Sequence, residues 1–248
     1  MRGPAERAAD RAAGRTGGPI LALEASTLRP GAALLGPAGE PWGRWQQGEG
    51  ERGTAPLAAA AAELLKARGL QVSDLLGVAV GTGPGSYTGT RAAIAFARAL
   101  VFAGGGRLVG VPSVAAAALG ELRRRPEARD VIVLVDARRG EVYRADYARA
   151  DDAAPGSRAT GSLASGAGVR ELKPPRLVAG PEASPAQNEF VFVIREPVPD
   201  PYDVAAVGRG RLLLGGDDPA AVLPLYLKRS HAEIVFDERV RTQGLGGD

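Results

Sequence analysis

Short apolar runs separated by turns occur throughout the first half of the chain, and longer alanine-rich segments lie between some of them. The short runs predict strands, at residues 20–26, 31–36, 42–47, 75–81 and 104–111. The longer segments have the length and the end signals of helices, at residues 54–69, 90–103 and 112–125. A first α/β lobe over residues 19–125 is therefore expected.

A comparable opening recurs after Asp130, which predicts a second lobe over residues 126–232. A strand that ends in an acidic corner is predicted at residues 131–140, and a return strand that alternates its faces at 141–147. A further strand is predicted at 189–196 and a helix at 204–215. Residues 150–188 are rich in Ala, Gly, Ser and Pro, so long mobile loops are expected there, with only RLVAG (176–180) strand-like. Residues 1–18 are expected to form a disordered tail and residues 233–248 a frayed one.

Hydrophobic residues make up 45% of the 248-residue chain and aromatic residues only 5%, so the core must consist of Ala, Val and Leu with closely packed backbones. The chain has no cysteine and one histidine, His231, which excludes disulfides, thiolate metal sites and paired-histidine metal sites. A net charge of +3 does not by itself indicate nucleic-acid binding. No apolar run is long enough to cross a membrane and no secretory signal is recognised, so a cytoplasmic protein is expected.

The stretch GTGPGSYTGTR (81–91) is the main candidate for a functional site, because a Gly-rich loop between a strand and a helix can hold phosphate groups. A Walker A loop needs a lysine directly after its last glycine, but Thr90 and Arg91 follow Gly89 here. A dinucleotide-binding fingerprint fits no better, since Tyr87 stands where a small residue is required. The remaining local interpretation is a tight turn that ends in a helix N-cap.

We call residues 81–89 the glycine loop. This loop is longer, and its sequence is more specific, than a turn capped by Ser86 or Thr88 requires. GTGPGSYTGTRAAIAFARAL resembles the signature of the TsaB (YeaZ) family, in which G-x-G-P-G-S-[FY]-T-G-x-R opens a helix. ILALEAST, VLVDARRGEVYRADY and LPLYLKRSHAE resemble three further family segments in the expected order, although the usual Asp of the first is Glu24. The matching positions are Gly83, Pro84, Gly85, Ser86, Tyr87, Thr88, Gly89 and Arg91 in the loop, and Asp136, Arg138, Gly140 and Glu141 in the second motif.

The resemblance implies an α/β fold with two ribonuclease H-like lobes of the actin-like ATPase (ASKHA) superfamily, the second of them degenerate. It also implies a non-catalytic subunit that is required, with the catalytic subunit TsaD and the ATPase TsaE, for N6-threonylcarbamoyladenosine formation at position 37 of tRNAs that read codons starting with A. The tRNA would be contacted through the complex. The partners would use ATP and a metal, whereas this chain would bind no cofactor tightly and would have no catalytic or metal-binding residue.

The two helices expected at about 56–68 and 90–103 carry more small residues than one core requires. Alanines in the second helix recur at spacings of three and four, which places them along one side. The resemblance implies that these helices bind TsaD, and that they pair with a second copy of the chain when TsaD is absent. The expected interface residues are Ala59, Leu64, Ala92, Ala95, Phe96 and Ala99. The alternative is that both stripes pack inside the lobe, against its own sheet.

A stand-alone ATPase or small-molecule kinase of the same superfamily is the alternative function. It would need acidic magnesium ligands in both lobes, and Glu24 and Asp136 are the candidate carboxylates. A single carboxylate at the end of a strand more often caps a turn than binds a metal. Arg91 is expected either to face a partner acid at the helix start or to be a solvated surface residue.

Overall fold

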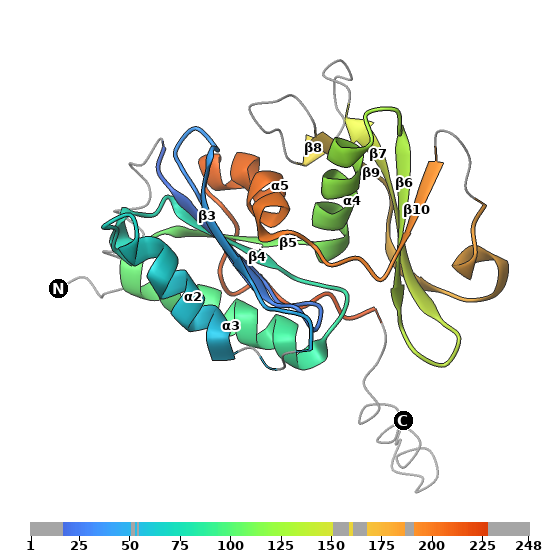
Figure 1. The fold of residues 1–248 in the computed structure, drawn as a ribbon, viewed down its shortest axis with the longest axis horizontal. Coiled ribbons are helices and arrows are strands. Elements are labelled where there is room, and N and C mark those ends of the chain that lie inside the picture. The colour runs from blue at the N-terminus through green and yellow to red at the C-terminus, as the bar shows by residue number, and fades with distance from the viewer. Residues whose placement is uncertain are drawn as a thin grey trace, which may run out of the picture.

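Two five-stranded sheets form the frame of the molecule in a computed structural model of the chain (Figure 1). The structure describes residues 17–50, 53, 55–150, 159–160, 168–186 and 191–227. The strands of the first sheet are, in spatial order, β3 (Pro41–Gln46), β2 (Gly31–Leu35), β1 (Ile20–Glu24), β4 (Gly77–Gly81) and β5 (Arg107–Val111). Those of the second are β10 (Val191–Arg195), β6 (Asp130–Asp136), β7 (Val142–Ala150), β9 (Gly168–Val178) and β8 (Ala159–Thr160). The tail expected at 233–248, and all of the tail expected at 1–18 except its last two residues, lie outside the described residues.

The first sheet contains both antiparallel and parallel pairs of strands. β1 pairs antiparallel with β2 and parallel with β4, and β4 pairs parallel with β5. The helices α2 (Ala55–Lys66) and α3 (Tyr87–Gly104) cover one face, and α5 (Pro201–Leu213) covers the other (Figure 1). Every residue of β1, β2 and β4 is buried as a result, which explains why their sequences are continuous apolar runs without alternation.

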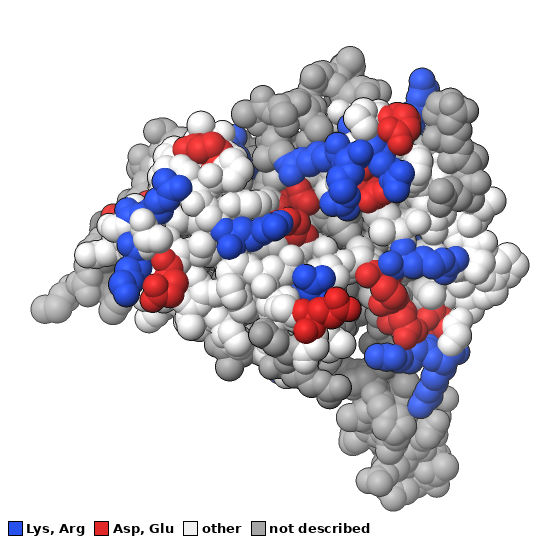
Figure 2. Space-filling view, viewed as in Figure 1, with Lys and Arg blue, Asp and Glu red and all other residues white. Residues whose placement is uncertain are grey.

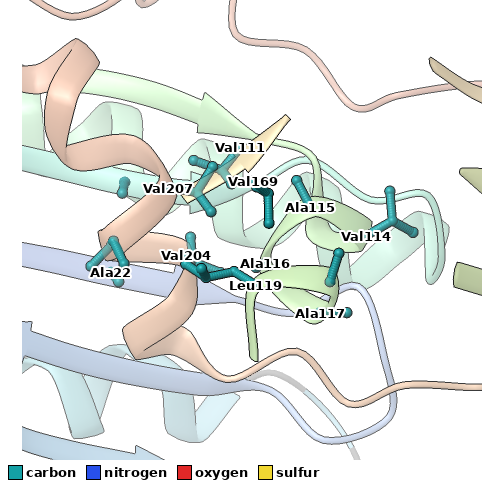
Figure 3. Packing of buried hydrophobic residues seen from close by; sticks show 14 of the residues in the cluster. Ala22, Val111, Val114, Ala115, Ala116, Ala117, Leu119, Val169, Val204 and Val207 are labelled. Atoms are coloured by element: carbon teal, nitrogen blue, oxygen red, sulfur yellow. The ribbon is translucent and has the colours of Figure 1, made fainter. Parts of the chain in front are cut away.

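Side chains of β1 alternate between two hydrophobic clusters. Leu21 and Leu23 belong to the cluster under α2 and α3, and Ala22 belongs to the cluster on the opposite face. That second cluster extends through α5 and α4 (Ser113–Arg124) to the second sheet, and Figure 3 shows Val204 of α5 and Ala116 of α4 within it. Small alanine side chains therefore let α4 pack closely between α5 and β6, joining the two sheets.

The second sheet repeats part of the first. β6 pairs antiparallel with β7 and parallel with β10, and β7 pairs antiparallel with β9. This is the pairing that β1 has with β2 and β4, and β2 with β3. Within the described ranges, no strand of the second sheet takes the position that β5 has in the first.

The expectation of long loops at 150–188 is wrong for the part of this region that the structure describes. β9 is an eleven-residue strand there and pairs with β7, and β8 pairs with β9. The prolines at 174 and 175 argued against a strand here, because proline has no N–H group to donate to a neighbouring strand. The β7–β9 register shifts between Arg144 and Asp146 and again before Tyr147, next to these prolines, so the strand tolerates them.

The C-terminal part of the expected second lobe packs with the first sheet. α5 contacts β1, β2, β4 and β5, whereas the boundaries at 126–232 placed it with the second lobe. It begins at Pro201, earlier than the expected 204, with the Asp200 side chain accepting a hydrogen bond from Tyr202 N–H (2.8 Å). After α5 the chain stays on the first sheet, where Asp217 N–H donates to Leu108 O (2.7 Å). The residues after β10 therefore complete the first layer.

Asp203 is buried where α5 packs against α4, and it forms an ion pair with Arg123. The helices approach closely at this point, since a Cβ on Gly120 would lie 2.5 Å from Asp203 Oδ2. Burial outweighs the attraction of Arg123 and raises the pKa of Asp203 to about 6. The folded state therefore favours the protonated form of this carboxyl group more than the unfolded state does.

We expect the wild-type protein to lose stability relative to the Asp203→Asn variant as the pH rises from about 4 to about 7. The folded-state pKa of about 6 lies above the ordinary value of 3.8, so the folded state holds a proton that the unfolded state releases. The stabilising contribution is present below the unfolded pKa and is lost as the pH rises through the folded pKa, by up to about 3 kcal/mol. Urea unfolding across this pH range measures it, and identical pH profiles for the two proteins would refute it.

Candidate functional site

The glycine loop turns the chain from β4 into α3 and packs tightly against the end of β1. A Cβ on Gly85 would lie 2.1 Å from Ser26 O, and a Cβ on Gly89 would lie 2.1 Å from Ala25 O. Gly83 and Gly85 also have φ angles of 87° and 153°, which side chains disfavour. The glycines of the signature are therefore required by the close approach of the loop to β1.

The helix after this loop begins at Tyr87, earlier than the expected start at residue 90. Ser86 is its N-cap, because the Ser86 Oγ accepts a hydrogen bond from Gly89 N–H (3.1 Å). Of the two expected capping residues, Ser86 is thus confirmed, and Thr88 instead lies exposed in the first turn. The sequence prediction of a tight turn with an N-cap is confirmed.

Glu24, which stands where the family usually has Asp, is completely buried beside the glycine loop. Its Oε1 accepts from Ser26 N–H (2.6 Å) and its Oε2 accepts from the Ser113 hydroxyl (2.8 Å). Ser113 Oγ in turn accepts from Gly83 N–H (3.1 Å). Burial raises the pKa of Glu24, although its hydrogen bonds with Ser26 and Ser113 oppose the rise. Glu24 therefore ties β1, the glycine loop and α4 together as a strand-end acid.

The second motif forms the turn between β6 and β7. Asp136 Oδ1 accepts from Arg138 N–H (2.7 Å), and the Arg138 guanidinium lies 3.2 Å from Asp136 Oδ2. Ala137 N–H donates to Glu141 O (3.0 Å), which closes the turn. Arg138 and Gly140 have φ angles of 67° and 78°. Asp136 is therefore also a strand-end acid that caps its turn, as the local interpretation predicted.

The two candidate magnesium ligands lie in different surroundings. Glu24 is buried in the first sheet, and Asp136 is half-exposed in the β6–β7 turn. In the part of the chain that the structure describes, no three His, Cys, Asp or Glu side chains come together in a way that could hold a metal ion. His231 lies outside the described residues.

The outer side of α3 is an exposed stripe of small residues. Ala92, Ala95 and Ala99 are exposed, whereas Ala93 and Ala97 face the core. Phe102, which the sequence analysis did not select, continues the stripe with 64% of its surface exposed. Its spacing of three residues from Ala99 would have indicated it. The alternative that this stripe packs inside the lobe is therefore wrong.

The neighbouring helix α2 lies on the same face of the first sheet (Figure 1). Ala59 is exposed on it, in agreement with an interface position. Leu64 of α2 and Phe96 of α3 are instead half-buried and pack against the core cluster beneath these helices. These two residues contribute to the lobe as well as to its surface.

Arg91 is exposed at the start of α3 and has an aromatic neighbour. Its Nη1 donates to the Tyr87 hydroxyl (2.5 Å), and its guanidinium carbon lies 5.1 Å from the Tyr87 ring centroid. The Tyr226 ring lies 5.4 Å from the Tyr87 ring. Tyr226 and Tyr143 of β7 both line a pocket beside the glycine loop. Sequence reasoning missed both tyrosines, because only the fold brings them to this loop.

Charged side chains of both signs are mixed over the face of the molecule shown in Figure 2. Ion pairs in the structure include Arg44 with Asp200 and Arg124 with Glu121. The blue side chains gather most densely in the upper part of this view, where red side chains border them. None of the helices in the described residues is long and apolar enough to cross a membrane.

Comparison of the sequence with known proteins gives matches along much of its length. Residues 54–166 match the family model of tRNA N6-adenosine threonylcarbamoyltransferase, TsaD. The chain is 36% identical over 85 residues to the Escherichia coli tRNA threonylcarbamoyladenosine biosynthesis protein TsaB, a match that covers 34% of this chain and only 36% of that protein. It is 32% identical over 170 residues to an uncharacterized protein of Mycobacterium tuberculosis, covering 66% of this chain and 69% of that protein.

Comparison of the structure with solved structures gives the fold. YeaZ from Pseudomonas aeruginosa has a TM-score of 0.66 and 24% sequence identity, covering 85% of this chain and 100% of that chain. A crystal structure of a Pseudomonas aeruginosa protein described as similar to the peptidase YeaZ has a TM-score of 0.68 at the same identity and coverage. These likenesses show an α/β actin-like fold. With the sequence matches to TsaB and to the TsaD model, they show that the chain belongs to the TsaB (YeaZ) family.

Proposed function

We propose that this chain is the non-catalytic partner of a TsaD-type catalytic subunit in N6-threonylcarbamoyladenosine formation at position 37 of tRNAs that read codons starting with A. The similarity to the Escherichia coli tRNA threonylcarbamoyladenosine biosynthesis protein and to the TsaD family model supports this role. A TsaE-type ATPase completes the proposed complex, and tRNA is contacted through it. The complete lack of cysteine is compatible with the reducing cytoplasm, where we place the complex.

The exposed stripe on α3 is the observation that best supports a partner surface. A second helix can approach a row of alanines closely, and Phe102 adds a large apolar side chain that water solvates poorly. Contiguous exposed apolar patches, unlike single exposed residues, mark interaction sites. When the catalytic partner is absent, we infer that two copies of the chain pair through the same stripes in an isologous dimer.

The environment of the acidic residues supports a subunit without a catalytic centre of its own. Both oxygens of Glu24 already accept hydrogen bonds, and the Asp136 carboxylate is held by Arg138. The second sheet has no counterpart of β5 among the described residues, which supports a degenerate second lobe of the actin-like ATPase superfamily. In this proposal the partners bind ATP and the metal, and this chain holds neither tightly.

Reconstitution of tRNA modification from purified cognate proteins tests the function. With TsaD, TsaE, ATP and threonylcarbamoyl-adenylate as donor, modified tRNA should form when this chain is present and should fall to background when it is left out. The chain alone should neither modify tRNA nor hydrolyse ATP. Full modification without this chain would refute the proposed role.

The same experiment distinguishes the alternative function, a stand-alone ATPase or small-molecule kinase. ATP turnover by the chain alone, persisting through further purification, would favour it. The Asp136→Asn and Glu24→Gln variants identify the source, because a magnesium site built on these carboxylates would lose turnover in both. Unchanged turnover in both variants would indicate a contaminating enzyme.

A further inference from the structure

A small pocket lies where the glycine loop, β7 and the segment at residues 220–226 meet, and its volume is about 90 Å³. Arg98 of α3 holds that segment by donating to the carbonyl oxygens of Ala220 (3.0 Å) and Val222 (2.7 Å). Leu225 N–H donates to Thr82 O (2.8 Å), which fixes the segment against the loop. The walls of the pocket therefore come from three parts of the chain that are far apart in sequence.

The described residues of the lining offer hydrogen-bond donors, and none of them is a carboxylate. Ser86 and Tyr87 place the N-terminus of the eighteen-residue helix α3 at the pocket. Ser86 caps Gly89 N–H, and the N–H groups of Tyr87 and Thr88 precede the residues that can bond within the helix. Among the described residues, no acceptor for these two N–H groups is seen outside the helix. The positive end of the helix dipole is thus directed at an uncharged lining.

Thr90 is an independent indication that the pocket takes a ligand. It lines the pocket, is only 3% exposed, and its hydroxyl has no hydrogen-bond partner within the part of the chain that the structure describes. A helical threonine hydroxyl commonly donates to the carbonyl four residues earlier, but the Thr90 hydroxyl makes no such bond, although the Ser86 carbonyl accepts the Thr90 N–H (3.0 Å). Buried hydroxyl groups without a partner are rare in folded proteins.

A positive charge lies beside two of the lining residues. The Arg91 guanidinium contacts the Tyr87 ring and hydroxyl, and Tyr87 packs against Tyr226. Both tyrosines and Tyr143 line the pocket, so neutral rings surround the donors. A group that enters this space meets donors and positive potential, and no Asp or Glu is among the described residues that line it, which favours an anion.

We propose that this pocket binds a small oxyanion, a phosphate or carboxylate group, on the N-terminal amides of α3 and the Thr90 hydroxyl. The volume is well above the about 10–15 Å³ that one water needs and well below the about 300–1,000 Å³ of sites for drug-sized ligands. The enclosed space is therefore large enough for one such group. The site does not depend on the role of the chain in tRNA modification.

Titration of the isotope-labelled full chain with inorganic phosphate and, separately, with acetate tests the site by amide NMR at constant ionic strength. At least one of the two anions should cause saturable shifts of the Tyr87 and Thr88 amide signals. The anion that saturates identifies the preferred group, and saturation by either one supports the site. No saturable shift with either anion, or shifts confined to surface arginines that indicate an adventitious ion only, would overturn the proposal.

The Thr90→Val variant tests the assigned hydroxyl. Valine has the same shape and leaves no unsatisfied donor, so the variant should fold as well as the wild type. Its dissociation constant for the anion should rise about tenfold, because a hydrogen bond to a charged group is lost. Thr88→Val is the matched control on the same helix, where the side chain is exposed, and its affinity should stay within about twofold.

Arg91→Gln is a second variant at an exposed position, expected to weaken binding and flatten its salt dependence. Equal affinity of wild type, Thr90→Val and Arg91→Gln would show that the anion binds elsewhere.

Discussion

The Gly89→Ala variant should be strongly destabilised, by about 3 kcal/mol or more, a large part of the total stability of an ordinary domain. An added Cβ would lie 2.1 Å from Ala25 O and 3.0 Å from Ser86 Oγ, and backbone atoms cannot yield as a flexible side chain can. The start of α3 would have to move away from β1, which would expose part of the core under Ala93 and Ile94. Urea unfolding followed by circular dichroism measures the loss.

Gly210→Ala is the matched control for this substitution. Gly210 also lies in a helix, but nothing lies within 4 Å of a Cβ built there, and it is exposed. This variant should be stabilised by about 0.4–1 kcal/mol, because alanine restricts the unfolded chain more than glycine does. If Gly89→Ala unfolds at the same urea concentration as the wild type, the tight contact between the loop and β1 is not required for stability.

The Ala95→Glu variant should lose its partner while it keeps its fold. Ala95 lies in the middle of the exposed stripe on α3, so a glutamate there is harmless in the free chain. In the proposed interface the carboxylate would be buried without a counter-charge, at a cost of about 3–5 kcal/mol, which corresponds to a loss of at least about 100-fold in affinity. Calorimetry with the purified TsaD-type subunit measures the affinity, light scattering reports the homodimer, and the reconstituted assay reports modification.

Leu214→Glu is the control for the added charge. Leu214 is 90% exposed at the end of α5, which covers the opposite face of the first sheet (Figure 1). This variant should bind the partner as the wild type does. The interface would have to be placed elsewhere if a folded Ala95→Glu protein still bound TsaD tightly and still supported tRNA modification.

The local elements around the glycine loop could be predicted from the sequence because each is specified by its own residues. The apolar runs of β1 and β4 are long enough for buried strands, and the loop has glycines where strand and helix approach closely. The capping residue Ser86 precedes the first turn of α3, although the helix boundary was set too late. The turn between β6 and β7 was equally predictable, since Asp136 caps it through a residue two positions away.

The position of β9 and the layer to which α5 belongs could not be predicted in this way. Only the end of β9, at residues 176–178, belongs to the run that was strand-like in the sequence. The part before it contains two prolines and is a strand because β7 pairs with it. The buried side of α5 consists of small and branched residues, such as Ala205 and Val207, that would fit against either sheet. In the folded chain α5 packs on the first sheet, against β1, β2, β4 and β5.

The sequence by itself determined the family signature, the order of strands and helices along the first lobe, and which alanines share one side of α3. Only the tertiary structure decided that Ala95 is exposed while Ala93 is buried, that Glu24 holds the glycine loop, and that Tyr226 reaches the pocket. Helix and strand periodicity depends on neighbours a few residues apart, so it can be recognised in the chain. Burial and pocket walls depend on elements that come from distant parts of the chain, and no local pattern specifies which of them will meet.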